Sequence, residues 1–364
     1  MNYIAWFILI FTLVQFLVAA ANLVFLQRFP KINQNFNLLV SVLIPARNEE
    51  KNIGNLLTGL QNQDYKNIEI IVFNDQSTDK TASIVNIFAE NDKRIKLINS
   101  NGLPEGWLGK NHACFSLAKH ASGKYFLFLD ADVNIGNNII QQTTQFSEKH
   151  KLGLLSIFPM QIMKTLGEQV TVPNMNFILL SLLPLVLVRK ICFSSIAAAN
   201  GQYMLFQSEI YWKIQPHEKM KTSKVEDIEI ARFFKQNKIK VACLVGNPSI
   251  TCRMYSGFSE AVYGFSKNVI QFFGGSFFMA ILFWLVTSLG FIAVLFSFST
   301  TIFLLYLLAI ILTRIFISIV SKQSVLRNLR FAVPQQITMG IFIFQAIINT
   351  YKKQYLWKGR NISS

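Results

Sequence analysis

The sequence has few of the residues that build disulfide frameworks or protein-only metal sites. Its four cysteines, Cys114, Cys192, Cys243 and Cys252, lie far apart and form no C-x-x-C pair, so neither a disulfide scaffold nor a zinc site is indicated. Its four histidines show no metal-ligand spacing. The patterns G-x-G-x-x-G and G-x-x-x-x-G-K-[ST] are also missing, which excludes a Rossmann fingerprint and a P-loop. This cysteine usage fits a reduced, cytoplasmic setting.

Charged residues are scarce, and acidic ones are the scarcer kind. They make up 15% of the 364 residues, against about 25% in an average soluble domain. There are 35 Lys and Arg against 19 Asp and Glu, a net charge of +16. Such an excess suits nucleic acid, an anionic membrane surface or an acidic substrate. No aromatic-basic stripe on a recognised nucleic-acid-binding motif is present, so we expect no nucleic-acid partner. Long apolar runs favour a membrane.

Apolar runs near both ends of the chain predict transmembrane helices. Residues 3–26 suit one span, and residues 277–298 and 302–320 suit two more. A secretory signal peptide is the alternative for the first run, but that run lacks a basic start and is too long. Arg28 and Lys31 follow it directly, so the positive-inside rule places the chain beyond them in the cytoplasm. We therefore expect a multi-pass protein of the cell membrane.

Two shorter apolar runs are harder to assign. Residues 337–348 carry charge close by and predict a re-entrant or interfacial helix rather than a clean span. Residues 177–188 contain Pro184 and end beside Arg189, which predicts an interfacial segment at the headgroup level. The expected organisation is an N-terminal anchor (1–27), a cytoplasmic domain (38–262), C-terminal transmembrane or interfacial helices (277–350) and a basic tail (351–364).

Strand-like and helix-like patterns alternate between these apolar blocks. Four segments are apolar enough to be buried strands: residues 38–45, 68–73, 95–98 and 124–130. Residues 53–60 follow the first of them with apolar side chains on one helix face. Such alternation predicts an α/β domain with a mainly parallel sheet. Ligands of such sheets bind beyond the carboxyl ends of the strands, where Asp75 and Asp130 lie.

The last of these strands, in FLFLDADV at residues 126–133, ends on two carboxylates. Asp130 and Asp132 flank Ala131, so a turn can aim both at one point, where they repel each other unless a cation lies between them. Hard divalent ions such as Mg²⁺ or Mn²⁺ take oxygen ligands and often bridge to phosphates. An acidic turn without function is the alternative, because a lone D-x-D has a high false-positive risk.

A second acidic pair opens a predicted helix, KVEDIEIARFFKQ at residues 224–236. Glu226 and Asp227 are adjacent there. Acids in a first helical turn are favoured by the helix dipole alone. The functional interpretation is a general base.

These motifs together resemble the membrane-bound family 2 glycosyltransferases, which have the GT-A fold. SVLIPARNEE resembles their opening strand, NDQSTDKT the nucleotide-binding turn, DAD the metal motif and ED the catalytic acid pair. Further stretches are most similar to the lipid-directed members that glycosylate carotenoid acids (diaponeurosporenoate-type), hopanoids or ceramide. These stretches are GWLGKNHAC, AAANGQYMLF, RMYSGFSEAVYGFSKN and WKGR.

The resemblance implies a donor site and a metal site. The donor would be a nucleotide-diphosphate sugar, with UDP-glucose expected, and Asp75 would hold the uracil or ribose. A divalent metal, Mg²⁺ or Mn²⁺, would sit on Asp130 and Asp132 and bind the donor diphosphate. Lys110 is a weaker candidate for the diphosphate, with a solvated lysine as the alternative. The expected donor-binding residues are Pro45, Ala46, Glu49, Asp75, Lys110 and Asp130.

The resemblance also implies a catalytic set. Asp227 would deprotonate the acceptor, Glu226 would support it, and Arg253 would stabilise the leaving diphosphate. Gln202 and His217 would lie on the acceptor side, although a lone polar loop histidine is the alternative for His217. The acceptor would be a membrane lipid such as a carotenoid acid, and the transfer would invert the anomeric centre.

Two departures from the family pattern matter. Asn74 and Gln76 replace the first Asp and the Gly of D-D-G-S-T-D, which puts the conformation of that turn in doubt. The Q-x-x-R-W of processive synthases appears as ITCRMY, with Ile250 and Met254 in place of Gln and Trp. One transfer per acceptor is therefore expected. The alternatives are a processive polysaccharide synthase-like enzyme, a nucleotidylyltransferase, and a non-catalytic lipid-binding membrane protein.

Overall fold

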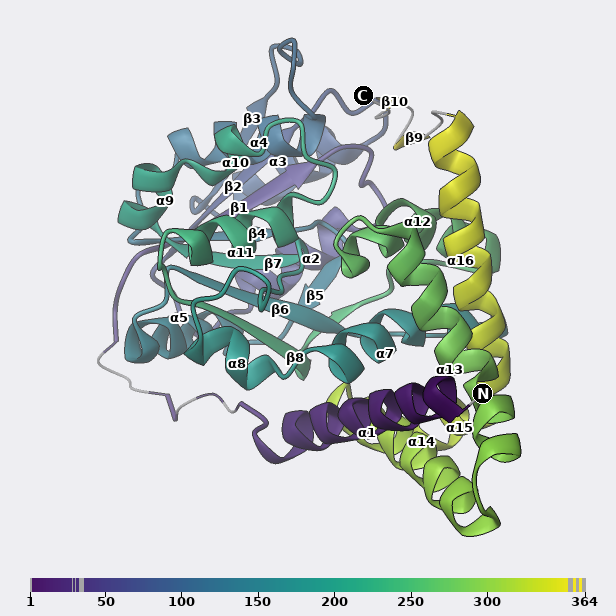
Figure 1. Ribbon diagram of the computed structural model, residues 1–364. Coiled ribbons are helices and arrows are strands. Elements are labelled where there is room, and N and C mark those ends of the chain that lie inside the picture. The colour runs from purple at the N-terminus through teal and green to yellow at the C-terminus, as the bar shows by residue number, and fades with distance from the viewer. Residues whose placement is uncertain are drawn as a thin grey trace.

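A sheet domain and a group of long helices lie side by side in the computed structural model (Figure 1). The structure describes residues 2–27, 29, 31–32, 36–352, 356–357 and 360–361. Arg28 and most of the predicted basic tail therefore lie outside the described residues. A short antiparallel pair, β9 (Leu356–Trp357) and β10 (Arg360–Asn361), is described near the C-terminus.

Eight strands form one mixed sheet. In chain order they are β1 (Val40–Ala46), β2 (Ile68–Asn74), β3 (Ile95–Asn99), β4 (Tyr125–Leu129), β5 (Val133–Ile135), β6 (Leu154–Gln161), β7 (Tyr203–Gln207) and β8 (Val241–Cys252). Their order across the sheet is β3-β2-β1-β4-β7-β6-β8-β5. The first four are parallel, as expected, but β7 runs antiparallel to both β4 and β6. The predicted, mainly parallel sheet is thus parallel in its first half and mixed beyond β4.

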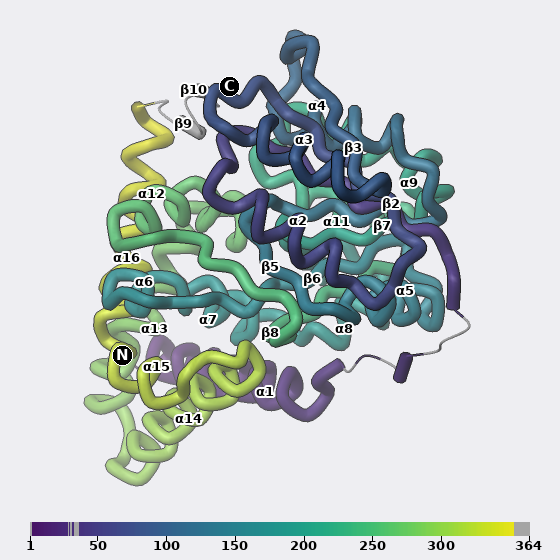
Figure 2. Tube along the Cα trace, turned by 180° about the vertical axis from the view of Figure 1, so that it is seen from behind, coloured from purple at the N-terminus to yellow at the C-terminus, as the bar shows by residue number. Residues whose placement is uncertain are grey.

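Helices cover both faces of this sheet, which explains why its strands are continuous apolar runs. The helices α2 (Ile53–Gln61), α3 (Thr81–Asn91) and α5 (Ile139–His150) lie on one face (Figure 2). The other face carries α4 (Gly109–Lys119), α9 (Ser208–Ile214), α10 (Pro216–Lys219) and α11 (Glu226–Gln236) (Figure 1). Side chains alternate along β1, so that Val42 and Ile44 pack under α2 while Leu43 packs under α4.

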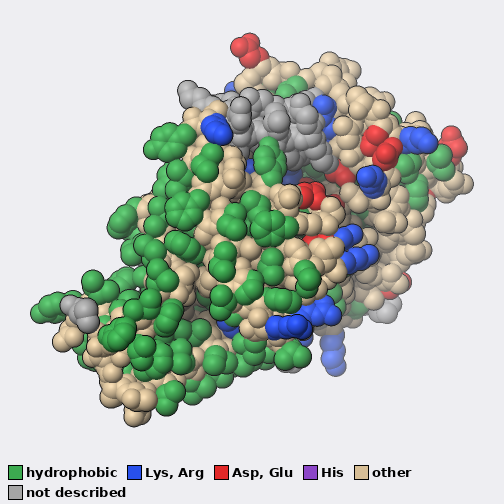
Figure 3. Space-filling view, turned by 90° about the vertical axis from the view of Figure 1, so that its right-hand side faces the viewer, with side chains coloured by type: hydrophobic (Ala, Val, Ile, Leu, Met, Phe, Trp, Pro, Cys, Tyr) green, Lys and Arg blue, Asp and Glu red, His purple; other side chains and the backbone are tan. Residues whose placement is uncertain are grey.

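Three helices are long and apolar enough to cross a membrane, as the sequence predicted. They are α1 (Asn2–Val24), α13 (Phe277–Ser297) and α14 (Thr300–Val320). Only 22–28% of the residues in their most apolar windows are buried, so most of their side chains remain at least partly uncovered by protein. Figure 3 shows apolar side chains gathered on this part of the molecule, with Lys and Arg at its border.

The C-terminal region holds further helices that pack on the sheet domain. These are α12 (Phe258–Asn268), the 3₁₀ helix η1 (Val269–Phe273), α15 (Val325–Arg330) and α16 (Ala332–Lys352). The segment predicted to be re-entrant or interfacial forms α16, which packs on α12 and α13. It is not one of the three helices with the length and hydropathy of a span. Its position in a membrane stays a prediction.

The predicted interfacial segment at residues 177–188 is the main correction to the fold. It forms the end of α7 (Pro173–Leu182) and α8 (Leu185–Lys190), which follow α6 (Leu166–Thr171). From Phe177 to Ser181 every residue is buried. The reason is long-range packing, because α1 and α14 cover the surface of α7 that was expected to face lipid headgroups. In Figures 1 and 2, α7 lies between α1 and the sheet.

A single side chain of α1 holds the break between α7 and α8. Pro184 has no N–H, so the carbonyl of Leu180 loses its helical partner there. Asn22 replaces that partner, since its Nδ2 donates to the carbonyl oxygens of Leu180 and Leu183, at 3.0 Å each. Its Oδ1 accepts from the backbone N–H of Leu185 at 2.7 Å. Asn22, one of the few polar residues of α1, therefore stabilises the α7–α8 break.

Replacing Asn22 with Leu tests this arrangement. The change makes α1 more apolar, yet it leaves three backbone groups of the α7–α8 break unpaired, at about 1–3 kcal/mol for each buried group. We expect the Tm of the detergent-solubilised protein to fall by at least about 4 °C. The same substitution at exposed Asn2, on the first turn of the same helix, is the control and should leave Tm unchanged. Equal Tm values for the two variants would contradict the assignment.

Candidate active site

Two adjoining cavities lie at the carboxyl ends of the parallel strands. The first, which we call the strand-end cavity, has a volume of about 160 Å³, and the second, the central cavity, about 460 Å³. The residues that line both are Lys110, Asp130 and Asp132. The strand-end cavity is also lined by Pro45, Ala46, Arg47, Glu49, Asp75, Gly109, Ala113 and Ala131. All six residues predicted to bind a donor are therefore brought together.

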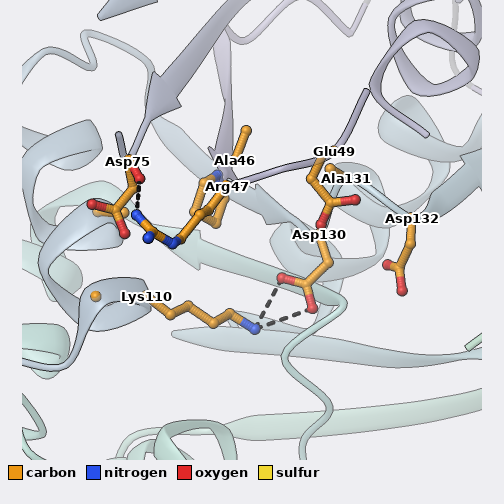
Figure 4. A pocket seen from close by; sticks show the side chains of 11 residues that line it. Ala46, Arg47, Glu49, Asp75, Lys110, Asp130, Ala131 and Asp132 are labelled. Carbon is orange, nitrogen blue, oxygen red and sulfur yellow. Dashed lines mark hydrogen bonds and ion pairs between the residues drawn. The ribbon is translucent and has the colours of Figure 1, made fainter. Parts of the chain in front are cut away.

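Backbone contacts between neighbouring strand ends fix the strand-end cavity. The N–H of Asp75 donates to the carbonyl oxygen of Ala46 at 2.8 Å, which joins the ends of β2 and β1. The guanidinium of Arg47 donates to the backbone oxygen of Asp75 at 2.6 Å (Figure 4). On the other side, the N–H of Asp130 donates to the carbonyl oxygen of Gln202 at 3.2 Å. These hydrogen bonds thus hold Asp75 and Asp130 in place at the edge of the sheet.

The turn after β2 is braced at the two positions where the sequence departs from the family pattern. Gln76 adopts φ 55°, the left-handed conformation for which glycine is the usual residue. The Oδ1 of Asn74 accepts from the N–H of Ser77 at 3.0 Å, and its Nδ2 donates to Asn99 Oδ1 at 2.9 Å. Asn74 therefore braces the turn from two sides, and the strain at Gln76 costs about 1–2 kcal/mol.

Lys110 is the cation at the centre of the site. Its Nζ lies 2.9 Å from Asp130 Oδ1 and 3.1 Å from Oδ2, and 3.3 Å from Glu226 Oε1 (Figure 4 shows the contacts with Asp130). Burial opposes the charge, but the attraction of Asp130 and Glu226 outweighs it and holds the pKa of Lys110 well above its usual value. A solvated lysine, the alternative interpretation, does not describe this residue.

Asp132 has the features of a cation ligand. Burial, and then repulsion from Asp130 and Glu49, raise its pKa to about 6. Its Oδ1 is buried and finds no hydrogen-bond donor within the described part of the chain. A buried acceptor without a partner is costly, and a divalent ion would satisfy it. The chemistry of the donor set therefore fits Mg²⁺ or Mn²⁺.

The site is not a cage that binds a metal with protein groups alone. Across the residues that the structure describes, no three His, Cys, Asp or Glu side chains converge on one point. Mg²⁺ is commonly held by one or two carboxylates together with substrate phosphates. Asp130 and Asp132 match that mode of binding.

The second acidic pair opens α11 on the wall of the central cavity. Asp227 Oδ2 accepts from the N–H of Gly201 at 2.9 Å, and Oδ1 accepts from the N–H of Ile228 at 2.8 Å. Burial and the charge of Glu226 raise the pKa of Asp227 to about 7, against the opposing effect of Lys110 and the two N–H groups. A carboxylate with a pKa near neutral pH is suited to accept a proton.

Gly201 is a site residue to which the sequence analysis gave no role. A Cβ atom there would lie 2.9 Å from Lys110 Nζ and 3.4 Å from Glu226 Oε1. Any side chain would therefore displace the groups that join the two acidic pairs. The one signal in the sequence is the N-G pair just before a strand, which by itself predicts only a turn. Gln202 lines the central cavity, with its Oε1 buried and unpaired among the described groups, and its acceptor-side role stays a prediction.

His217 is not where the resemblance placed it. The ring lies 4.7 Å from that of Phe128, and its Nδ1 is 3.0 Å from the Tyr211 hydroxyl. Burial, with a smaller contribution from Lys110, lowers the pKa of His217 to about 3, so the ring is neutral. It lines neither cavity. The expected acceptor-side position is wrong, because His217 is a core residue of an aromatic cluster.

Arg253 is likewise outside both cavities. Its Nη2 lies 2.7 Å from Oε1 of Glu168, whose side chain is fully buried. The pair ties α6 to the residue after β8. In this structure Arg253 therefore pairs with Glu168, and its role at a leaving diphosphate stays a prediction; the cation beside Asp130 is Lys110.

The sequence is similar to those of known glycosyltransferases. Residues 41–215 match the family described as Glycosyl transferase family 2. A 4,4'-diaponeurosporenoate glycosyltransferase of Staphylococcus aureus (strain USA300) is 29% identical over 276 residues, 70% of this chain and 68% of that protein. The enzyme of the same name from Staphylococcus haemolyticus is 27% identical over 242 residues, 63% of this chain and 60% of that protein. The matched region thus spans 60–68% of these relatives.

The fold is shared with a solved structure over almost its whole length. The mannosyltransferase PcManGT from Pyrobaculum calidifontis, in complex with GDP-Man and Mn²⁺, superposes with a TM-score of 0.60 at 15% identity. The alignment covers 95% of this chain and 98% of that one. The superposition shows a shared GT-A fold. The family match and the glycosyltransferase relatives show that the chain is a glycosyltransferase whose residues 41–215 form a family 2 domain.

Proposed function

We propose that this glycosyltransferase is inverting and non-processive, and that it moves a hexose from a nucleotide-diphosphate sugar to a membrane lipid. One observation carries the proposal. Asp130, Asp132 and Lys110 stand between the strand-end cavity and the central cavity, and Asp227 lines the central one. A donor in the first cavity and an acceptor in the second would meet at these residues.

The donor occupies the strand-end cavity in this proposal. Asp75 binds the nucleoside, Pro45, Ala46 and Glu49 line its pocket, and the diphosphate reaches Asp130. UDP-glucose is the proposed donor, which rests on the resemblance to the lipid-directed members. PcManGT binds GDP-Man, which supports a nucleotide sugar as the class.

A divalent metal, held by Asp130 and Asp132, would withdraw charge from the departing diphosphate. The Mn²⁺ in PcManGT supports the class of cofactor. Lys110 adds a second positive charge at the same place, 2.9 Å from Asp130. Such stabilisers act where charge develops in the transition state.

Asp227 is the proposed base. It takes the proton of an acceptor hydroxyl while the acceptor oxygen bonds to the anomeric carbon. The bond from that carbon to the diphosphate breaks, and the diphosphate leaves with the electron pair. Attack from the face opposite the leaving group inverts the anomeric centre. Glu226 lies beside Asp227 and raises its pKa, which keeps it basic enough for this task.

The proposed acceptor is a carotenoid acid or a similar lipid. The staphylococcal relatives are named for 4,4'-diaponeurosporenoate, a lipid-like acceptor. The membrane-type helices α1, α13 and α14 support a lipid as the class. Lys31 follows α1, and Arg327 and Arg330 follow α14, so the positive-inside rule favours a cytoplasmic catalytic domain.

The metal role is tested by Asp132→Asn. Losing one stabiliser of the leaving group typically costs about 10²–10³-fold in rate, and we expect a loss in transfer of that size. Mn²⁺-dependent UDP binding, measured by titration calorimetry, should weaken in parallel. Exposed Asp64, which lines neither cavity, provides the matched Asp→Asn control. Full turnover of Asp132→Asn in the presence of a chelator would contradict the metal site.

The base is tested by the pH profile. Because Asp227 accepts a proton only when ionised, kcat on a hydroxyl acceptor should rise as the pH increases through about 7 and fall below it. Asp227→Asn should abolish that dependence together with most of the rate. A carboxylate acceptor is already ionised, so its profile should be flatter. An unchanged pH profile in Asp227→Asn would place the base elsewhere.

The variants Lys110→Met and Arg253→Met distinguish the roles of the two cationic side chains. The loss of Lys110 should lower kcat by about 10²-fold, because this side chain lies 2.9 Å from Asp130, where the proposal puts the diphosphate. The loss of Arg253 should lower Tm and leave kcat nearly unchanged, since Glu168 then keeps a buried carboxylate without its ion-pair partner. Thermal unfolding and single-turnover kinetics on both variants check this. A kinetic loss in Arg253→Met at unchanged Tm would return the diphosphate role to Arg253.

A further inference from the structure

A third cavity adjoins the central cavity on the side away from the donor. Its volume is about 150 Å³, and its walls come from α7, residues 195–199, α11 and η1. We call it the apolar chamber. The residues that it shares with the central cavity are Phe158, Ala199, Ile228 and Phe272. These side chains therefore stand at the boundary between the two cavities.

The chamber differs in chemistry from the site that it adjoins. Its wall is formed mainly by aliphatic and aromatic side chains, including Ile178 and Leu179 of α7. Arg232 and Gln271 are its main polar side chains. A cavity of this size with mainly apolar side chains in its wall can accept a small apolar ligand. The central cavity, by contrast, is lined by both acidic pairs.

The chamber lies between the active site and the membrane-type helices. On one side α7 packs on α1 and α14, and on another η1 leads directly into α13. Leu182, on the chamber wall, is 38% exposed, and Phe193, near it in sequence, is 69% exposed. The outer end of the chamber thus reaches the surface at the exposed Leu182.

Resting on the proposed transfer to a lipid, we infer that the apolar chamber holds the hydrocarbon chain of the acceptor and that the acceptor is a single-chain lipid. A cavity of about 150 Å³ takes a benzene-sized ligand, or about six carbons. One linear chain with methyl branches fits that space. A fused ring system, or two chains side by side, exceeds it.

The residues of α11 indicate the direction in which the hydrocarbon chain of the acceptor runs. Asp227 lines the central cavity, Ile228 lines both cavities, and Arg232 lines the chamber one turn farther on. Five residues of helix advance roughly 7.5 Å. A chain whose head lies at Asp227 therefore runs along α11 toward Arg232. The guanidinium at the far end is placed to meet anionic headgroups where the chain leaves the protein.

Photolabelling tests this inference without requiring turnover. The probe is hexadecanol carrying a diazirine at its sixth carbon, added to the full-length protein in nanodiscs. We expect mass spectrometry to locate the adducts in residues 178–183, 195–199, 228–232 and 271–272. Photoreactive cholesterol, a fused ring system, should give no adducts there. Adducts elsewhere only, or equal labelling by cholesterol, would overturn the single-chain inference.

Substitutions that fill the chamber provide the second arm. Ala197→Trp occupies the chamber and should lower labelling by at least about tenfold. Ser195→Trp, at an exposed position of the same wall, repeats the test should the first variant fail to fold. Ala82→Trp on α3, which lines none of the three cavities, is the matched control. Undiminished labelling in both chamber variants would refute the site.

Hydrolysis of UDP-glucose and other nucleotide sugars in Mn²⁺, measured on the same samples, reports on the donor side alone. Wild-type hydrolysis in Ala197→Trp with lost labelling supports the chamber. Labelling of the chamber in a protein that hydrolyses no nucleotide sugar would refute the proposed function and leave the chamber standing.

Discussion

The arrangement of the active site depends on holding several carboxylates close together in a mainly basic protein. Glu49, Asp130, Asp132, Glu226 and Asp227 come from three separate parts of the chain and meet around two cavities. Their mutual repulsion would force them apart without a compensating charge. Lys110 supplies it by contacting Asp130 on one side and Glu226 on the other. The ammonium group thereby links the end of β4 to the start of α11.

Local patterns in the sequence were enough to predict those site residues that directly follow a strand. The alternation of strand and helix placed Asp75 and Asp130 at one edge of the sheet, because carboxyl ends of parallel strands share an edge. The face of α2 followed from helical periodicity alone. The same reasoning could not give the antiparallel β7, since strand direction depends on pairing between distant segments.

What the sequence could not give is the mutual placement of side chains from distant segments. Motif resemblance assigned Arg253 to the leaving group, but buried Glu168 pairs with that guanidinium. Lys110, with no more than a weak motif, proved to be the central cation. His217 is polar in sequence and yet packs among aromatic rings. In each case the deciding partner lies many residues away, so no local window contains the information.

The bond between Asn22 and the α7–α8 break has a consequence for biogenesis. Asn22 emerges from the ribosome long before its partners at Leu180 and Leu185, so α1 is made well before the segment that it braces. The catalytic domain is then completed against α1, and its own fold includes part of a helix with the length and hydropathy of a membrane span. Cutting off α1 to obtain a soluble enzyme would remove a piece of the domain's core. A boundary between α1 and the catalytic domain can therefore be drawn in the sequence, but in the folded protein the two pack as one unit.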